Sequence, residues 1–174
     1  MPASPTLYTH VDSPLGPLLV ASRDGRLVRI AFPRESRAFV PKPGWRRDDA
    51  AFADARQQLG DYFAGKRTSF DLPFHLEGGV FQMKVWQALS AIPYGETASY
   101  GDIARATGEG VAASRAVGTA CGENPVPIVV PCHRVIGANG ALVGFGGGLA
   151  AKRHLLALER RVKPKTGAQM DLFG

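Results

Sequence analysis

The first part of the chain alternates short apolar stretches with turn-forming residues. Between Leu7 and Phe32 the apolar stretches are interrupted at residues 13–16 and again at residues 23–26, where Asp24-Gly25 is a hairpin signal. Because such alternation is typical of half-buried strands, the pattern predicts three antiparallel strands. These strands form a small sheet at the start of the predicted fold.

A basic segment punctuated by prolines, residues 33–47, follows the strands and is predicted to be a loop. Apolar residues then recur at helical spacing behind the acidic pair Asp48-Asp49, which favours a helix start. The pattern therefore predicts one helix that ends at Gly65. Residues 70–76 are predicted to add one more strand before a linker at residues 77–79.

The second half of the chain has the pattern of short helices joined by glycine-containing turns. One helical pattern begins near Phe81 and stops at residues 92–95, and a capping-box pattern at residues 99–102 opens a second helix that Thr107-Gly108 ends. Two short helices joined by such a turn predict a helix-turn-helix. The inner face of its second helix is predicted to carry Ala113, Val117, Ala120 and Cys121.

An extended segment leads to the second cysteine. The prolines of residues 124–136 exclude a helix there, and Ile128-Val129-Val130 predicts a buried strand that ends just before Cys132. A hairpin turn at residues 137–140 and a glycine-rich loop at residues 144–148 come next. The last periodic segment predicts one more helix.

Composition excludes several protein classes, and charge adds a candidate partner. The 174 residues are 45% hydrophobic and 21% charged, which suits one ordinary domain or two small ones and excludes collagen-like, coiled-coil and wholly disordered chains. No apolar run reaches the roughly 18 residues of a membrane span, and no signal peptide is recognisable, so we expect a cytoplasmic protein that binds no membrane. The net charge of +6 suits a polyanionic partner, and a merely basic surface is the alternative.

The cysteines point to a thiol nucleophile. Cys121 and Cys132 are too few for a disulfide scaffold, and no Cys/His cluster has zinc spacing, so we expect no metal. His133 follows Cys132 and is a candidate base for its thiol. Because neighbours in an extended chain face opposite ways, the two need a turn or a bridging water to interact. A purely structural Cys-His pair is the alternative.

Glu159 favours the catalytic alternative. It lies three and four residues after Leu156 and Leu155, so its carboxylate shares their inward helical face. A buried acid needs a partner, and the N–H of His133 is a suitable one. Cys132, His133 and Glu159 then form a nucleophile, a base and an orienting acid. A salt bridge between Glu159 and a nearby arginine at the end of the helix is the alternative.

Two further features concern ligands. Arg115 points away from the inner face of the predicted helix, among the small residues of positions 112–118, so that helix can approach nucleic acid closely. A solvated arginine is the alternative.

The loop at 144–148 lacks a dinucleotide-binding fingerprint because Leu149 follows it. A loop that closes over a flat ligand with Phe145 stacking fits better, and a turn packed by one aromatic ring is the alternative.

Ordered motifs make a family resemblance specific. The segment from Asn124 to Ile136, NPVPIVVPCHRVI, resembles the active-site segment of the O6-alkylguanine-DNA alkyltransferases, the methylated-DNA–protein-cysteine methyltransferases. Residues 94–100, 114–118 and 147–159 also match motifs of this family, so the resemblance covers about residues 80–160. The preceding half resembles the family's small first domain more loosely.

The resemblance implies an α/β (α+β) fold of two parts. A small N-terminal antiparallel sheet with a helix, ribonuclease-H-like, is expected at residues 1–77. A mostly helical domain with the helix-turn-helix and the active-site segment is expected at residues 80–161, and a flexible tail at residues 162–174.

The resemblance also implies a reaction. Cys132 takes the alkyl group from an O6-alkylguanine flipped out of the duplex, and O4-alkylthymine is a second candidate substrate. His133 and Glu159 activate the thiol through a water, Tyr100 donates toward the guanine ring, and Asn124 braces the turn that bears the nucleophile. The product is a stable thioether, so each molecule acts once and no cofactor is needed.

The implied partner is double-stranded DNA, bound through its minor groove and largely without regard to sequence. Arg115 fills the gap that the flipped base leaves in the stack. The residues implied to contact DNA beside it are Tyr100, Ala112, Ala113 and Ser114. The implied substrate pocket uses the backbone carbonyl of Val135 and the side of the loop at Phe145 and Gly146, which replace a Tyr-Ser pair of some members and leave more room.

The end of the chain suggests a second partner. Gln169-Met170-Asp171-Leu172-Phe173 resembles the bacterial sliding-clamp-binding motif, with Met where Leu is usual. The motif predicts that the tail docks on the replicative sliding clamp. An unattached apolar end is the alternative, since short motifs often occur by chance.

Two other classes of function compete with a single-turnover DNA-repair alkyltransferase. A non-catalytic protein that binds alkyl lesions and recruits other repair factors is one alternative, but such relatives replace the nucleophile, whereas Cys132 is present. A Cys-His-Glu hydrolase is the other, and it differs by turning over repeatedly. The sequence favours the alkyltransferase.

Overall fold

A four-stranded sheet opens the fold in the computed structural model, which describes residues 4–162. Its strands, in the spatial order β3-β2-β1-β4, are β1 (Leu7–Val11), β2 (Leu18–Arg23), β3 (Arg26–Ala31) and β4 (Arg46–Arg47). The first three pair antiparallel, which confirms the sequence prediction. Asp24 and Gly25 form the β2–β3 turn with φ angles of 53° and 77°, the backbone that favours an Asp-Gly hairpin.

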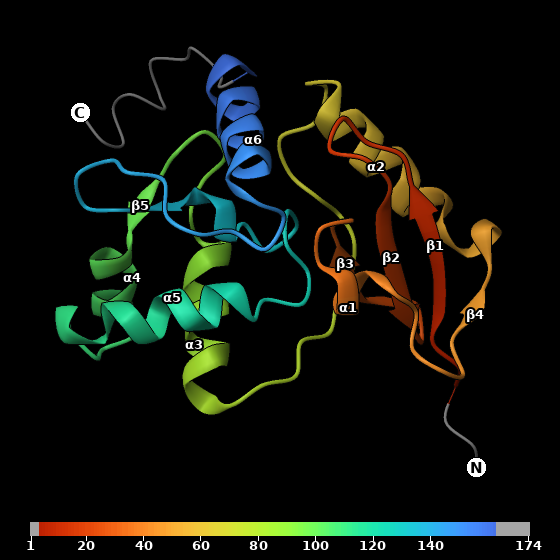
Figure 1. Ribbon diagram of the computed structural model, residues 1–174, viewed down its shortest axis with the longest axis horizontal. Helices are drawn as coiled ribbons and strands as arrows, with labels where there is room; N and C mark the ends of the chain where they lie inside the picture. Colours follow the sequence, from red (N-terminus) through yellow and green to blue (C-terminus); the bar gives the residue numbers. More distant parts are fainter. Residues whose placement is uncertain (1–3, 163–174) are drawn as a thin grey trace.

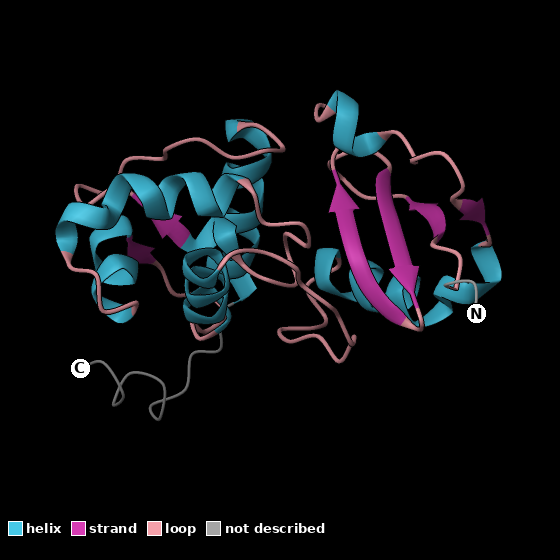
Figure 2. Cartoon of the chain, turned by 90° about the horizontal axis from the view of Figure 1, so that it is seen from below, coloured by secondary structure: helices cyan, strands magenta, loops and turns pink. Residues whose placement is uncertain are grey.

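Segment 33–47 is not wholly a loop as predicted. It contains the short helix α1 (Ser36–Phe39) and strand β4, which pairs parallel with β1. The sheet is therefore mixed, and two residues are too few to give β4 a periodic signal. Beyond a 3₁₀ turn, η1 (Asp49–Phe52), the predicted helix is present as α2 (Ala53–Phe63) and lies across one face of the sheet (Figures 1 and 2).

The strand predicted over residues 70–76 is wrong. Leu27 donates its N–H to the carbonyl of Pro73 at 2.8 Å, and His75 donates to the carbonyl of Leu27 at 2.9 Å, which leaves one isolated bridge between Leu27 and Phe74. Proline has no N–H, so the pairing does not continue into a ladder. The segment instead lies beside β3 and connects the sheet to the second part of the molecule.

Four helices and a two-stranded parallel sheet make up that second part, which lies beside the four-stranded sheet (Figure 1). Its elements are α3 (Val80–Ser90), β5 (Ala98–Ser99), α4 (Tyr100–Ala106), η2 (Val111–Ala113), α5 (Ser114–Gly122), η3 (Cys132–Arg134), β6 (Val135–Ile136) and α6 (Leu149–Val162). The predicted capping box starts α4, because Asp102 N–H donates to Ser99 Oγ at 3.0 Å and Ser99 N–H donates to Asp102 Oδ2 at 2.9 Å. None of the helices within residues 4–162 is long and apolar enough to cross a membrane.

The buried strand predicted at Ile128–Val130 is a buried turn. Ile128 has a φ of 75°, and Val130 N–H donates to the carbonyl of Val126 at 2.9 Å. Asn124 holds the turn with its side chain: Nδ2 donates to Val130 O at 2.8 Å and Oδ1 accepts from Val126 N–H at 3.0 Å. The apolar run correctly predicted that the segment is buried, whereas the Asn-Pro pair at its start was the feature that indicated a turn.

Two apolar clusters form the core, and Phe74, Leu76 and Phe145 pack against both. Leu155 and Leu158 of α6 pack with β2, β3 and α2 in the first cluster. The second cluster fills the space among α3, α4 and α5 around Trp86 and Val117. The helix that follows the glycine-rich loop therefore packs on the sheet part although it belongs in sequence to the helical part.

Trp86 generates a stability prediction. Its indole N–H donates to Ala120 O at 2.9 Å, and a Cβ added at Gly78 would lie 2.7 Å from its ring, whereas a Cβ at Gly79 would meet only Gln82 Oε1, at 3.7 Å. We expect Gly78→Ala to lower the free energy of unfolding by about 1–3 kcal/mol because the ring has to shift. Gly79→Ala is the matched control in denaturant titrations. Equal losses in the two variants would contradict the packing described.

Candidate active site

Cys132 lies at the edge of a cavity between the glycine-rich loop and helices α4 and α5, which are the two helices of the predicted helix-turn-helix. It begins the turn η3, its N–H donates to Val130 O at 2.8 Å, and 6% of its surface is exposed. The cavity has a volume of about 690 Å³. On one side it is lined by α4 and α5, with Tyr100, Ser114 and Arg115, and on the other by residues 143–146.

The structure brings most of the predicted ligand-facing residues to this cavity. Tyr100, Ser114, Arg115, Cys132, Phe145 and Gly146 line it. Ala112 and Ala113 lie on η2, just before α5, and Ala112 is exposed. The side chain of Val135 is buried away from the cavity, and its carbonyl accepts a hydrogen bond from Lys152 Nζ at 2.6 Å.

Opposing effects act on the Cys132 thiol. Burial raises its pKa to about 11, while the hydrogen bond from the Asn124 side chain and the positive charge of Lys152 lower it in part and the Glu35 carboxylate raises it. The thiol is therefore protonated in the resting protein at neutral pH. It needs a base to become a nucleophile.

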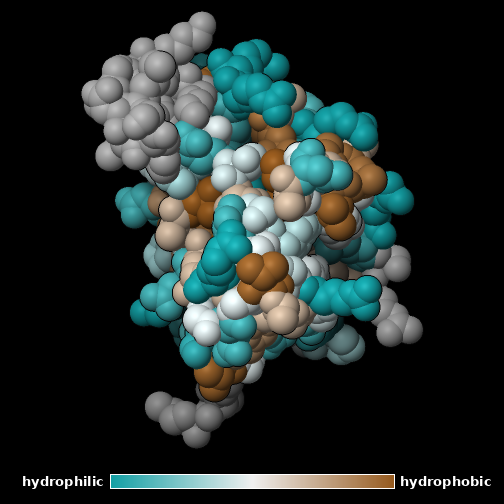
Figure 3. Space-filling view, turned by 90° about the vertical axis from the view of Figure 1, so that its left-hand side faces the viewer, coloured by the Kyte–Doolittle hydropathy of each residue, from teal (hydrophilic) through white to brown (hydrophobic). Residues whose placement is uncertain are grey.

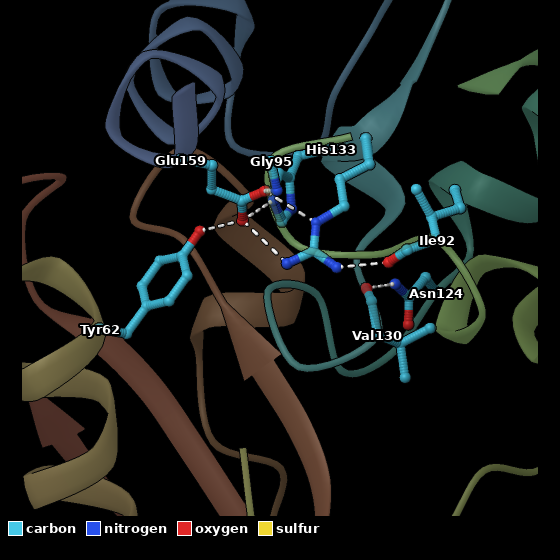
Figure 4. A network of polar contacts seen from close by, with 8 residues as sticks. Tyr62, Ile92, Gly95, Asn124, Val130, His133 and Glu159 are labelled. Atoms are coloured by element: carbon cyan, nitrogen blue, oxygen red, sulfur yellow. Dashed lines mark hydrogen bonds and ion pairs between the residues drawn. The ribbon is translucent and has the colours of Figure 1, made fainter. Parts of the chain in front are cut away.

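Glu159 is the centre of a buried polar network (Figure 4). Its Oε2 lies 2.6 Å from His133 Nε2 and accepts from the Tyr62 hydroxyl at 2.6 Å. Arg134 donates from Nε to Oε1 at 2.8 Å and from Nη2 to Oε2 at 3.0 Å. This carboxylate, 1% exposed, has the predicted histidine partner and also an arginine, but the arginine is Arg134 of the active-site turn and not one at the end of the helix.

This network fixes the protonation of both partners. Burial alone would raise the pKa of Glu159, but the hydrogen bond from His133 and the hydrogen bonds and positive charge of Arg134 hold it well below the usual range. Burial lowers the pKa of His133, so its ring is neutral at pH 7. Because Glu159 is ionised, Nε2 must carry the histidine proton, and Nδ1 is left as an acceptor. Nδ1 is buried and has no hydrogen-bond partner in the part of the chain that the structure describes.

Sequence reasoning missed three residues of this site. Tyr62 comes from α2, and no local pattern relates it to Glu159. Arg134 follows the Cys-His pair, and its Nη1 donates to Ile92 O at 2.7 Å, which ties the active-site turn to the end of α3. Lys152, 1% exposed, donates to Val135 O and, at 2.8 Å, to Val143 O. Lys152 precedes Glu159 by seven residues, which is two helical turns. This spacing places both residues on one helix face and could have predicted that Lys152 is buried.

Cys121 differs from the sequence expectation. The helical pattern predicted a core position, but the side chain is only partly buried and lines the same cavity as Cys132. Burial and the neighbouring Cys132 raise its pKa to about 12. Within residues 4–162 no group of three or more His, Cys, Asp or Glu side chains has an arrangement that could hold a metal ion.

Residues of α4 and α5 line the cavity, and these helices lie at the end of the molecule that faces the viewer in Figure 3. Arg115 is exposed on α5, and apolar and near-neutral surface lies among the hydrophilic side chains of this face. The residues near the arginine are small, with Ala113 just before α5 and Gly118 on it.

Two family models match the chain. Residues 80–161 match "6-O-methylguanine DNA methyltransferase, DNA binding domain", and residues 6–76 match "6-O-methylguanine DNA methyltransferase, ribonuclease-like domain".

Similar proteins and structures agree with these models. A methylated-DNA–protein-cysteine methyltransferase of Mycolicibacterium paratuberculosis is 52% identical over 95% of this chain and 98% of its own length. One of Mycobacterium tuberculosis is 47% identical over the same shares. The crystal structure of Mycobacterium tuberculosis OGT in complex with DNA matches 97% of this chain and 99% of its own, with a TM-score of 0.85 and 46% identity.

Glu159→Gln tests the buried network. At pH 7 we expect a loss of about 3–5 kcal/mol in the free energy of unfolding, because the Arg134 guanidinium stays buried opposite a neutral amide. The pKa of Glu159 is lowered on folding, so its contribution is complete above the unfolded carboxyl pKa of about 4.3 and is lost as the pH falls further. The difference between wild type and variant should therefore shrink from pH 7 to pH 3.

Denaturant titrations across this pH range measure the difference. The control is Glu77→Gln, which removes an exposed ion pair with Arg23 and should change stability by less than about 1 kcal/mol. A Glu159→Gln loss that stays constant with pH would contradict the assignment of an ionised, paired carboxylate.

Proposed function

The chain belongs to the 6-O-methylguanine DNA methyltransferase family, and from this membership we propose that it is a methylated-DNA–protein-cysteine methyltransferase that repairs DNA with Cys132 as the alkyl acceptor. One observation carries the assignment of the acceptor. Cys132 faces the cavity directly beside a buried, neutral His133 that an ionised Glu159 orients. The nucleophile, the base and the orienting acid thus lie next to one another, in this order, in one site.

The resting site lacks a direct contact between the thiol and its base. Within the described residues no hydrogen bond joins Cys132 to His133, and the free acceptor is His133 Nδ1. A water bound to Nδ1 takes the thiol proton and passes it to the ring, and the Glu159 carboxylate stabilises the imidazolium that forms. This relay explains why a carboxylate is kept ionised in the interior.

The transfer step exchanges one bond for another. The Cys132 sulfur attacks the alkyl carbon, the carbon–O6 bond breaks, and its electron pair stays with the guanine. Burial raises the pKa of Tyr100 to about 12, so its hydroxyl keeps its proton at neutral pH and donates toward the departing base. The thioether that remains is not hydrolysed by the groups of this site, so each molecule acts once. The step needs no cofactor.

The protein binds DNA through its helical part. We further propose that α5 enters the minor groove and reads little sequence, because the residues around Arg115 are small and offer few groups that could read base edges. Arg115 lines the mouth of the cavity while remaining exposed. It is therefore placed to fill the gap left by a base that rotates into the cavity.

The proposed pocket uses backbone and aromatic groups. Val135 O accepts from Lys152, and a carbonyl has two acceptor positions, so we propose that it also accepts from an N–H of the base. Phe145 forms a wall and packs edge-on against Phe32, with ring centroids 5.3 Å apart. Activity on O4-alkylthymine and a cytoplasmic location stay predictions.

The domain organisation proposed here places a sheet domain at residues 1–77, the DNA-binding and alkyl-transfer domain at 80–161 and a tail at 162–174. The family-model matches to residues 6–76 and 80–161 support it. A non-catalytic lesion-binding protein is not favoured, because the acceptor cysteine is present and similar proteins are named methyltransferases.

Cys132→Ala tests the function. With a duplex that carries O6-methylguanine labelled in the methyl group, wild type should saturate at one label per protein molecule, and the variant should take none while it binds the duplex nearly as tightly. Cys121→Ser, the matched control in the same cavity, should still take one label. Label on the Cys132→Ala protein, or repeated turnover of wild type, would refute the mechanism.

Arg115→Ala separates base flipping from simple phosphate contact. Stabilising an extruded base offsets a cost of a few kcal/mol, so we expect transfer to slow by about tenfold or more while duplex affinity falls by less. Single-turnover kinetics and equilibrium binding on the same duplex measure the two effects. The exposed hairpin residue Arg26 serves as control, and Arg26→Ala should change neither. Equal losses in rate and affinity would make Arg115 an ordinary phosphate contact.

Clamp binding by residues 169–173 is proposed from sequence alone, because these residues lie outside the described residues. A Gln with Leu172-Phe173 offers a polar anchor and two apolar side chains to a groove. Truncation after Thr166 should abolish capture by the purified sliding clamp and leave single-turnover repair on short duplexes unchanged. Equal capture of both proteins would refute the proposal.

A further inference from the structure

Gly146 and Gly147 of the glycine-rich loop have no room for side chains. A Cβ at Gly146 would collide with the Glu35 carboxylate, and one at Gly147 would lie 2.8 Å from the Phe32 ring. Neither glycine has a positive φ, so backbone conformation does not require glycine at these positions. Crowding by residues 32–35, the segment that follows β3, is the physical reason for their small size.

The segment behind the loop is itself anchored. Glu35 Oε2 accepts from the N–H of Phe32 at 2.8 Å, and the N–H of Glu35 donates to Phe32 O at 2.9 Å. The Phe32 ring is buried and packs on Phe145 of the loop. One carboxylate oxygen of Glu35 is thus tied to its own turn, and the other, Oε1, is directed at Gly146.

Glu35 also has an electrostatic effect on the nucleophile. Its negative charge acts on the Cys132 thiol, opposite to the charge of Lys152. Gly146 and Cys132 line the same cavity. Glu35 therefore stands behind the wall of the cavity near the place where the transferred group must sit.

We propose that Glu35, a residue of the sheet part, determines which alkyl groups the site accepts. Its anchored carboxylate backs Gly146 and limits how far loop 144–148 can yield. A methyl group fits without moving the loop, whereas a benzyl group has to displace it against Glu35. This inference rests on the proposed alkyl transfer and assigns part of its substrate selectivity to the first part of the chain.

Two substitutions of Glu35 distinguish an effect of the size of its side chain from an effect of its charge. Single-turnover rates are measured for the full chain on duplexes with O6-methylguanine and with O6-benzylguanine. Glu35→Ala should raise the benzyl-to-methyl rate ratio by about tenfold, since each extra carbon of room is worth a factor of ten or more in a tight pocket. Glu35→Gln keeps the size and the hydrogen bond to Phe32 and should leave the ratio within about twofold of wild type.

A double-mutant cycle tests the contact directly. Gly146→Ala should slow transfer of the methyl group by about tenfold, and adding Glu35→Ala should restore most of the rate because the new methyl group then has space. Gly144→Ala is the matched control in the same loop, because nothing lies within 4 Å of a Cβ at Gly144. It should show no coupling to Glu35.

The outcomes distinguish this inference from the proposed function. Absence of label on wild-type protein would refute alkyl transfer itself. One label per wild-type molecule together with an unchanged ratio in Glu35→Ala, or with no coupling between residues 35 and 146, would refute only the role of Glu35. Thermal unfolding of the four proteins of the cycle gives a readout without transfer, and coupling in melting temperature is expected there too.

Discussion

A carboxylate without access to water must find its hydrogen-bond donors inside the protein, and the whole molecule is arranged around that requirement at Glu159. The donors come from α2, from the active-site turn and from the turn after α3, so elements far apart in sequence are held at one point. Removing any one of them leaves a buried ionic group incompletely satisfied. Tyr62 is the donor that couples the sheet part to this centre.

The site places few groups in the cavity and many behind it. Within the described residues, Cys132 faces the ligand space, while its neighbours His133 and Arg134 are directed into the interior toward Glu159. The 3₁₀ turn makes this division possible, because the side chains of consecutive residues in a turn can point to opposite sides of the cavity wall. Lys152 adds a second interior anchor by bonding the carbonyls of β6 and of the loop.

The sequence patterns predicted the features that depend on residues close together in the chain. Three strands, the Asp-Gly hairpin, the capping box at Ser99 and the amphipathic α6 all follow from spacing and turn chemistry, and so did the inward direction of Glu159. The turn at Ile128 was missed because an apolar run reports burial and not backbone direction. Tyr62 and Glu35 were missed because their roles arise only when the first part of the chain packs on the second. The identity of the nucleophile came from an ordered motif rather than from periodicity.

The position of α6 along the chain has a consequence during synthesis. Leu155 and Leu158 complete the first core, and Glu159 completes the polar centre, yet all three follow every other element of the site. A nascent chain that already contains Cys132, His133, α4 and α5 still lacks the acid that orients the base. The base and the acid that orients it therefore come together only after α6 has been synthesised and has packed on the rest of the chain.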